Sequence, residues 1–264
     1  MNKIFTIAHI TVKRELRNKM IYILLAIAFF FIFIARGCTT GKVNIEKALI
    51  SPEQIINMTI AIAFNVILFW GLSLCGLLAM NAISRELDEE TVVLTVTKPI
   101  KRTWFLLGKF LGVLFIVFVN LVVLSTGFLL LFYFRTGVVT LSIFSGLIVA
   151  FLNFILIISL IFLFSLFLPR VVSALLAFAV YTISLGLSIP FSFEKIRMYL
   201  GEPSLSTKLL HYLLPQLGGL HLYATSFISS YFPSTQGFWS VIDVAGYSIV
   251  VWLVMVLTFQ RKAI

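Results

Sequence analysis

Long apolar runs alternate with short polar segments along the chain, and this pattern predicts six membrane-spanning helices. A helix needs roughly 20 apolar residues to cross a hydrocarbon core about 30 Å thick. The apolar runs, the first of them slightly short, are residues 20–35, 55–80, 105–134, 138–168, 171–189 and 239–259. The sequence therefore predicts an all-α polytopic membrane protein in which residues 1–264 form one transmembrane domain.

The connections between runs set the expected ends of three spans. Only residues 135–137 separate the third and fourth runs, and Pro169-Arg170 separates the fourth and fifth, so both pairs should form tight antiparallel hairpins. Pro190 should end the fifth span, because proline lacks a backbone N–H and clashes with the carbonyl four residues earlier.

Two further segments are expected to form helices outside the spans. In residues 1–19, apolar side chains recur at three-to-four spacing ahead of a basic cluster, which predicts an amphipathic helix at the membrane interface. The alternative is a positive flank of the first span. Residues 190–238 combine prolines, a glycine pair and apolar helical patterns. They predict short outer helices between spans five and six that either lie on the membrane surface or re-enter it.

Composition supports lipid as the solvent of this chain. Its residues are 61% hydrophobic and 11% charged, whereas a soluble domain is about 25% charged. The net charge of +10 would suit nucleic acid in a soluble protein. Here the basic residues flank apolar runs, where they orient spans against anionic headgroups, so no nucleic-acid partner is expected.

Six spans place both termini on one side of the membrane. That side carries 13 of the 20 basic residues, counted over the two termini, the segment after span two and the turn after span four. Lysine and arginine are enriched in cytoplasmic loops. Both termini are therefore expected in the cytoplasm, with the chain in the inner (cytoplasmic) membrane of a cell.

A dense charge cluster lies between the second and third spans, in residues 81–104. Each ion at the bilayer centre costs ~2.5–3.5 kcal/mol or more, so this loop belongs in water. Ser84 is expected to cap a helix that begins at Arg85. Glu86 and Glu90 repel each other at i, i+4 spacing. Such a helix is marginal alone and is better explained by docking on a partner, the alternative being a solvated charged loop.

The far end of this helix is less well defined by propensity. Lys98 and Pro99 provide a stop signal, but residues 91–97 are a β-branched run that favours a strand. Local propensity predicts helix only for residues 85–90.

These features resemble the coupling loop of type-2 ABC-transporter permeases, the membrane subunits of bacterial ABC exporters. That family shows an acidic turn, a threonine, a hydrophobic stretch, a Pro-hydrophobic-basic step and a Gly-Lys pair. The matching residues are Glu86 to Glu90, Thr91, Val92 to Thr97, Lys98-Pro99-Ile100 with Arg102, and Gly108-Lys109. The chain departs from the pattern at Glu90, where glycine is common, and at Leu94-Thr95-Val96, where Leu-Leu-Ser is common.

The resemblance implies a transport mechanism shared with other chains. A short helix would seat in a groove of a separate P-loop ATPase subunit, which binds ATP and Mg, and a second permease copy or a homologous permease would complete the transporter. The implied ATPase interface is Arg85, Glu86, Leu87, Asp88, Glu89, Glu90, Leu94, Lys98 and Pro99. The implied beginning of span three is Arg102, Gly108, Lys109 and Gly112, of which the two glycines permit close helix contact.

The chain itself carries no recognisable catalytic or cofactor motif. The segment GCTTGKV is one residue short of a phosphate loop between Gly37 and Gly41, and Val43 stands where a Ser or Thr ligates magnesium. His211 and His221 lack partners at metal-ligand spacing. The chain is therefore expected not to be an enzyme and to hold neither metal nor cofactor.

Polar side chains inside the predicted spans are expected mainly to bond neighbouring helices, at ~0.6–2 kcal/mol each. The asparagines are Asn57, Asn65, Asn81, Asn120 and Asn153. One face of span five carries Ser173, Ala177, Tyr181, Ser184 and Ser188. We interpret this stripe, with Asn65, as a dimer face that borders a transport pathway, the alternative being close packing.

Two other functions stay open at this level. The chain can be an ATP-independent secondary carrier or channel-like protein, or a scaffold without transport. Spans one, two, four and five have no centred Asp, Glu, Lys or Arg. This argues against an ion-coupled carrier, which generally needs an intramembrane ion.

Overall fold

The computed structural model describes residues 3–17, 19–38, 52–88, 102–137, 140–193, 198, 204–229 and 237–261. In these ranges the ordered elements are all helices, which confirms the all-α prediction. They are α1 (Lys3–Leu16), α2 (Lys19–Cys38), α3 (Pro52–Asp88), α5 (Arg102–Thr136), α6 (Ser142–Ser165), α7 (Arg170–Ser192), α9 (Leu205–Leu213), α10 (Leu217–Ser226) and α11 (Gly237–Arg261).

Five of these helices are long and apolar enough to cross a membrane. Their candidate spans are Ile56–Ala82, Thr103–Phe134, Ser142–Ser165, Arg170–Ser192 and Gly237–Phe259, in the ranges that the structure describes. They correspond to the second to sixth predicted runs. The first predicted run forms the 20-residue helix α2.

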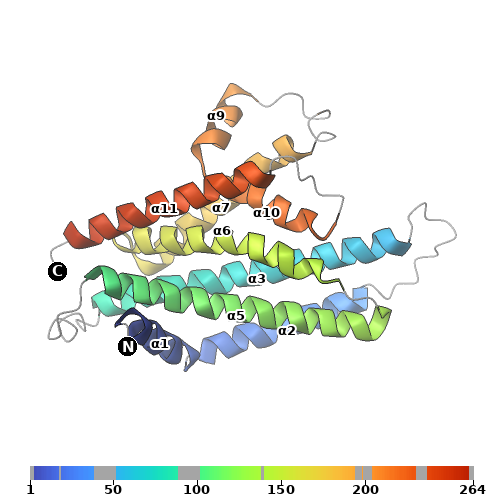
Figure 1. Ribbon diagram of the computed structural model, residues 1–264, viewed down its shortest axis with the longest axis horizontal. Helices are drawn as coiled ribbons and strands as arrows, with labels where there is room; N and C mark the ends of the chain where they lie inside the picture. The colour runs from blue at the N-terminus through green and yellow to red at the C-terminus, as the bar shows by residue number, and fades with distance from the viewer. Residues whose placement is uncertain are drawn as a thin grey trace.

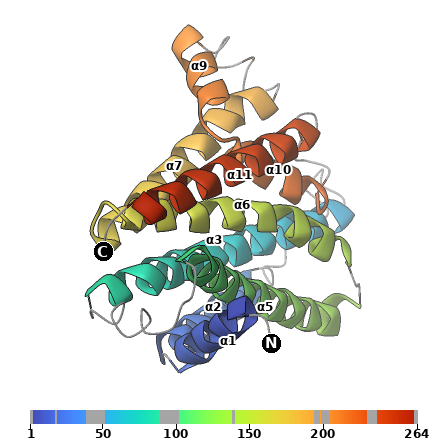
Figure 2. The same cartoon turned by 60° about the vertical axis from the view of Figure 1, so that its left-hand side comes forward.

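Helices α3, α5, α7 and α11 lie around α6, while α2 lies beyond α5 and α1 packs at the beginning of α5 (Figures 1 and 2). Helix α6 contacts α3, α5, α7, α10 and α11. Its side chains at Ile157, Ile158, Ile161 and Phe162 are fully buried. The apolar core of the protomer therefore sits along α6, and polar groups that reach α6 are removed from both lipid and water.

Three expected helix ends are wrong. Ser84 was expected to cap a new helix, but α3 continues without a break through Ser84 to Asp88, since no Gly or Pro interrupts residues 81–88. Pro190 lies inside α7, which continues to Ser192. Pro190 is close enough to the end of α7 that few hydrogen bonds are lost.

The connection between α5 and α6 is also longer than residues 135–137. Helix α5 ends at Thr136 and is followed by Gly137, whose φ of 67° is the left-handed conformation that glycine adopts at little cost. Its N–H donates to the Tyr133 carbonyl at 2.9 Å, which closes the last turn. Helix α6 then starts at Ser142 rather than at residue 138.

Helix α1 packs tightly across the beginning of α5, and two glycines make this contact possible. A Cβ at Gly108 would lie 2.7 Å from Ile7 Cβ and 3.1 Å from the Ile4 carbonyl oxygen. A Cβ at Gly112 would lie 2.9 Å from Thr11 Cβ. Gly108 and Gly112, which were predicted to allow close helix contact, do so, and the helix that packs against them is α1.

Replacing Gly108 by alanine should therefore destabilise the protein. The nearest atoms are a Cβ and a backbone oxygen, which cannot swing aside, so the cost should be about 1–3 kcal/mol. Thermal unfolding of purified protein measures the change. Gly186→Ala is the matched control, because a Cβ there meets nothing within 4 Å. Equal melting temperatures for the two variants would contradict the packing argument.

Candidate functional site

Helix α10 is buried among the spans. It packs against α6, α7 and α11 (Figures 1 and 2), and Leu217, Leu220 and Ala224 are fully buried. A Cβ at Gly218 would lie 2.5 Å from the Ser184 carbonyl oxygen of α7. A side chain at Gly218 would therefore hold α10 away from α7. Helix α10 therefore lies inside the protomer, and whether these helices re-enter the membrane or lie on its surface stays a prediction.

The turn between α9 and α10 is held by side chains of two spans. Ser184 Oγ donates to the Pro215 carbonyl oxygen at 2.7 Å and accepts from Gly218 N–H at 3.1 Å. Asp243 Oδ2 accepts from Gln216 N–H at 2.8 Å. Non-helical backbone at membrane depth is tolerated only where protein or water satisfies it. These bonds meet that requirement for the turn.

This turn lies about halfway along the spans that hold it. The Tyr247 hydroxyl donates to the Leu213 carbonyl oxygen at 2.7 Å, and Tyr247 is residue 11 of the 23-residue span Gly237–Phe259. Asn153 Nδ2 donates to the Leu217 carbonyl oxygen at 3.2 Å from residue 12 of the 24-residue span Ser142–Ser165. Helices α9 and α10 therefore form a hairpin that reaches the middle of the bundle.

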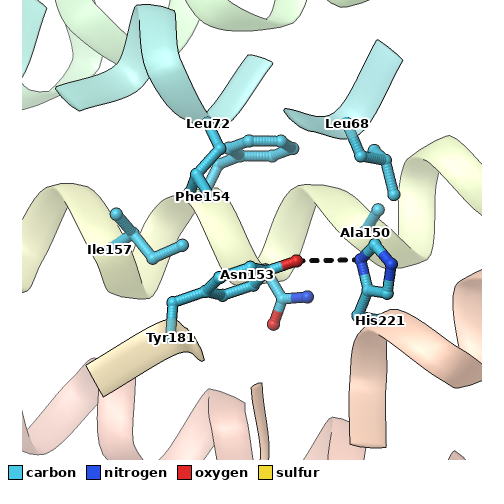
Figure 3. A pocket seen from close by; sticks show the side chains of 8 residues that line it. All are labelled: Leu68, Leu72, Ala150, Asn153, Phe154, Ile157, Tyr181 and His221. Carbon is cyan, nitrogen blue, oxygen red and sulfur yellow. Dashed lines mark hydrogen bonds between the residues drawn. The ribbon is translucent and has the colours of Figure 1, made fainter. Parts of the chain in front are cut away.

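A chain of hydrogen bonds joins α10 to α3 and α7. Asn65 Nδ2 donates to the Ala61 carbonyl oxygen at 2.8 Å, which turns its Oδ1 toward His221 Nε2, 2.6 Å away. Because that oxygen only accepts, Nε2 carries the proton and Nδ1 of the neutral ring accepts. The Tyr181 hydroxyl lies 2.9 Å from Nδ1 and is then the donor (Figure 3). Three helices meet in one directed network.

Beside this network lies a cavity of about 10 Å³, close to the size that holds one water molecule. Asn153, Tyr181 and His221 supply its polar lining, and the rest is apolar (Figure 3). Asn153 is 4% exposed, and its Oδ1 accepts no hydrogen bond from the residues that the structure describes. The cavity can therefore take one small polar molecule that donates to Asn153.

A second hollow lies between α3 and α2. Its volume is about 530 Å³ and its exposed lining is almost wholly apolar. Phe31 of α2 and Ile62, Asn65, Val66, Phe69 and Trp70 of α3 form its walls. It can accommodate an apolar group but offers a charged one no partner.

The predicted stripe on span five lies inside the protomer. Ser173, Ser184 and Ser188 are buried, and Ser173 and Ser188 donate to carbonyls of α7 itself at 2.7 and 2.8 Å. Tyr181 and Asn65 both contact His221. Within one protomer Ser184, Tyr181 and Asn65 bond the α9–α10 hairpin. Their role at a pathway or between two copies stays a prediction.

The predicted coupling residues fall at the end of α3 and beyond it. Arg85, Glu86, Leu87 and Asp88 are helical and form the last turns of α3. Glu89, Glu90, Leu94, Lys98 and Pro99 lie outside the described residues, as do the predicted strand-like residues 91–97. Arg102 is the first residue of α5.

Lys109 links the ends of α3 and α5. Its side chain is 5% exposed, and Nζ donates to the Ala82 carbonyl oxygen of α3 at 2.7 Å. The ammonium also lies 5.2 Å from the centre of the Phe105 ring, a cation–π contact. A buried lysine is costly unless it is hydrogen-bonded, and here its bonds join the two helices that flank the charged loop.

A comparison with protein families identifies the architecture. A family model described as "ABC-2 family transporter protein" matches residues 15–193, more than half of the chain. The chain belongs to the ABC-2 transporter family. No curated protein matches it. The chain is thus a multi-pass membrane component of the ABC-2 type, consistent with a type-2 ABC permease, and such components are generally not catalytic themselves.

Sequence reasoning missed the role of His221 in this ABC-2 protein. It treated the residue only as a metal candidate, and no group of three His, Cys, Asp or Glu gathers in the described ranges. The signal that was available is the run LGGLHLYATS, where adjacent glycines precede a histidine in an apolar helix. Two glycines that allow close helix approach, next to a side chain that needs partners, indicate a buried polar contact.

The Tyr181→Phe variant should weaken the hairpin of this ABC-2 protein. It removes the donor to His221 Nδ1 and leaves a buried acceptor unsatisfied, at a cost of about 1–3 kcal/mol. Thermal unfolding in lipid nanodiscs checks the prediction. Tyr133→Phe is the control, since Tyr133 is 48% exposed. A Tyr181→Phe protein as stable as the control would show that the network contributes little.

Proposed function

We propose that the chain is the membrane-spanning permease subunit of an ABC exporter, driven by ATP that a separate P-loop ATPase subunit hydrolyses. In this proposal ATP and Mg bind the ATPase. Two permease chains form the transport unit in the inner (cytoplasmic) membrane. Helix α2 is the first of six spans, both termini are cytoplasmic, and α1 lies at the membrane interface.

The unbroken course of α3 is the observation that carries this proposal. The helix runs 37 residues from Pro52 to Asp88, ten more than the candidate span Ile56–Ala82 that it contains. Arg85 to Asp88, which resemble the ATPase-facing part of the coupling loop, are thus part of the same rigid helix as Asn65. A force applied at the loop would reach the His221 network through continuous helix.

Two contacts would stiffen the cytoplasmic end, so that a movement of the loop displaces α3 and α5 together. Lys109 ties α5 to α3 through the Ala82 carbonyl oxygen. Helix α1 is clamped on α5 at Gly108 and Gly112. Transmission requires a two-state element and a stiff connection to it. The α1–α3–α5 end supports the stiff connection, and the ATPase dimer would supply the two states.

Charge reversal in the acidic turn tests the ATPase interface. The double variant Glu86→Lys, Glu89→Lys should lose association with the ATPase and with it ATP-dependent export, because a basic turn cannot seat in a groove that receives an acidic one. Co-purification and vesicle transport measure the two effects. The control is Glu46→Lys, Glu53→Lys, which reverses two acids expected on the opposite side of the membrane. Normal association and export in the first variant would refute the coupling proposal.

The Lys109→Met variant separates binding from transmission. The change leaves the acidic turn intact but removes the bond between α3 and α5, so the ATPase should still co-purify while transport per ATP hydrolysed falls. Lys13→Met on the exposed face of α1 is the control. If Lys109→Met transports with wild-type efficiency, Lys109 is a structural residue only.

A further inference from the structure

Helix α1 carries different kinds of side chain around its circumference, and its contact with α5 fixes which of them face outward. Its inner face packs on α5 through Ile7 and Thr11, which lie against two glycines at the beginning of that helix (Figures 1 and 2). The outward side divides into an apolar flank and a basic flank. Because the glycine contacts set the rotation of α1 about its own axis, they also set the direction of both flanks.

Phe5 and Leu16 form the apolar flank. They are eleven residues apart, about three helical turns, so they share one face, and their exposed fractions are 69% and 43%. Lys13 and Arg17 form the basic flank, which adjoins the apolar flank on the side away from α5. Both side chains are exposed, and neither has a partner among the described residues. Glu15, the one acid of α1, is 3% exposed, so both flanks are free of negative charge.

The position of α1 along α5 sets the depth of these flanks in a bilayer. The candidate span Thr103–Phe134 has 32 residues, which at 1.5 Å per residue make it roughly 48 Å long. A hydrocarbon core about 30 Å thick, centred on this span, begins ~9 Å from its first residue. Gly108 and Gly112 lie roughly 8 and 14 Å from that residue. Helix α1 therefore contacts α5 where the hydrocarbon core meets the headgroups.

This depth favours lipid over a soluble subunit as the partner of the outward side. An apolar flank at the edge of the hydrocarbon core faces acyl chains, which a soluble ATPase does not reach. Cations beside an apolar face are typical of helices that bind anionic membrane surfaces. Lysine and arginine extend long apolar stems that carry their charges to the headgroups. Arginine also donates two parallel hydrogen bonds to one phosphate.

We propose that Lys13 and Arg17 bind the headgroup of an anionic phospholipid, with its acyl chains along Phe5 and Leu16. Residues four apart on a helix have Cβ atoms about 5–6 Å apart, so both cations reach one headgroup. A zwitterionic lipid carries its own cation beside the phosphate and gains less from this pair. The proposal rests on the proposed function, which places α1 at the membrane interface, and adds the class of lipid and the residues that select it.

Fluorescence quenching at one labelled position tests the site in the full-length chain. A bimane is attached at Leu16→Cys, with Cys38 and Cys75 replaced by serine and alanine, and the protein is reconstituted with phospholipids brominated on their acyl chains. At equal content, brominated phosphatidylglycerol should quench the label more than brominated phosphatidylcholine. Each basic residue favours anionic lipid by about fivefold, so Lys13→Gln, Arg17→Gln should lower this preference by roughly tenfold or more.

Two further variants are the controls. Arg261→Gln, Lys262→Gln removes the same charge at the C-terminus and should leave the preference unchanged. Lys13→Arg, Arg17→Lys keeps both charges on α1 and should retain it. Equal quenching by the two lipids in the labelled parent, or equal losses in the α1 and C-terminal variants, would refute the lipid site. Relief of quenching by bound ATPase would assign the basic flank to that subunit and refute it as well.

Co-purification of the ATPase, measured on the same samples, separates this proposal from the proposed function. If the ATPase is bound but the label shows no preference for phosphatidylglycerol, the lipid site fails while the permease function stands. If the preference is present and no ATPase is bound, the lipid site stands and the permease proposal fails. Quenching by neither lipid would contradict both the site and the interfacial placement of α1.

Discussion

The fold depends on satisfying backbone groups that leave a helix in the middle of a membrane bundle. The turn from α9 to α10 exposes carbonyls and N–H groups about halfway along the spans, a depth at which a membrane would offer them few hydrogen-bond partners. Ser184, Asp243, Tyr247 and Asn153 each bond one of these groups or the adjacent α10 terminus. Removing Ser184 or Asn153 leaves a buried polar group unpaired, so the hairpin and the spans that hold it stabilise each other.

The same hairpin is joined to the far end of the bundle, where α3 ends and α5 begins, by a single helix. Asn65 bonds His221 of α10, and the helix that carries Asn65 continues to Asp88. At 1.5 Å per residue, that stretch of α3 is roughly 35 Å long. Lys109 and the glycine contacts with α1 brace its far end. One continuous helix thus connects the α9–α10 hairpin with the charged residues at the end of α3.

Hydrophobic periodicity and length predicted the helices but not where polar segments fold back. The apolar runs correspond to α2, α3, α5, α6, α7 and α11, and the last five of these helices contain candidate membrane spans. The helix ends predicted at Ser84 and Pro190 are wrong. A residue that can cap or break a helix does not end it when the residues on both sides form helical turns. The polar contacts of α10 could not be predicted, because Asn153, Tyr181 and His221 are far apart in sequence and meet only in the packed bundle.

The coupling site stays a prediction, made from the order of residue types in the loop; of its residues, Arg85 to Asp88 form the last turns of α3. The span-five stripe was predicted from helical spacing, which correctly groups Ser184 and Ser188 on one buried face. Helical spacing does not show what such a face contacts. Within the protomer Ser184 bonds the α9–α10 turn, and Ser188 bonds the backbone of α7.

Isolation of the chain from its native membrane, followed by identification of bound proteins and assay of ATP hydrolysis, tests the central claim most directly. The account predicts that a separate P-loop ATPase co-purifies and that reconstituted vesicles transport only when ATP is supplied. Transport by the chain alone, driven by an ion gradient and indifferent to ATP, would contradict it.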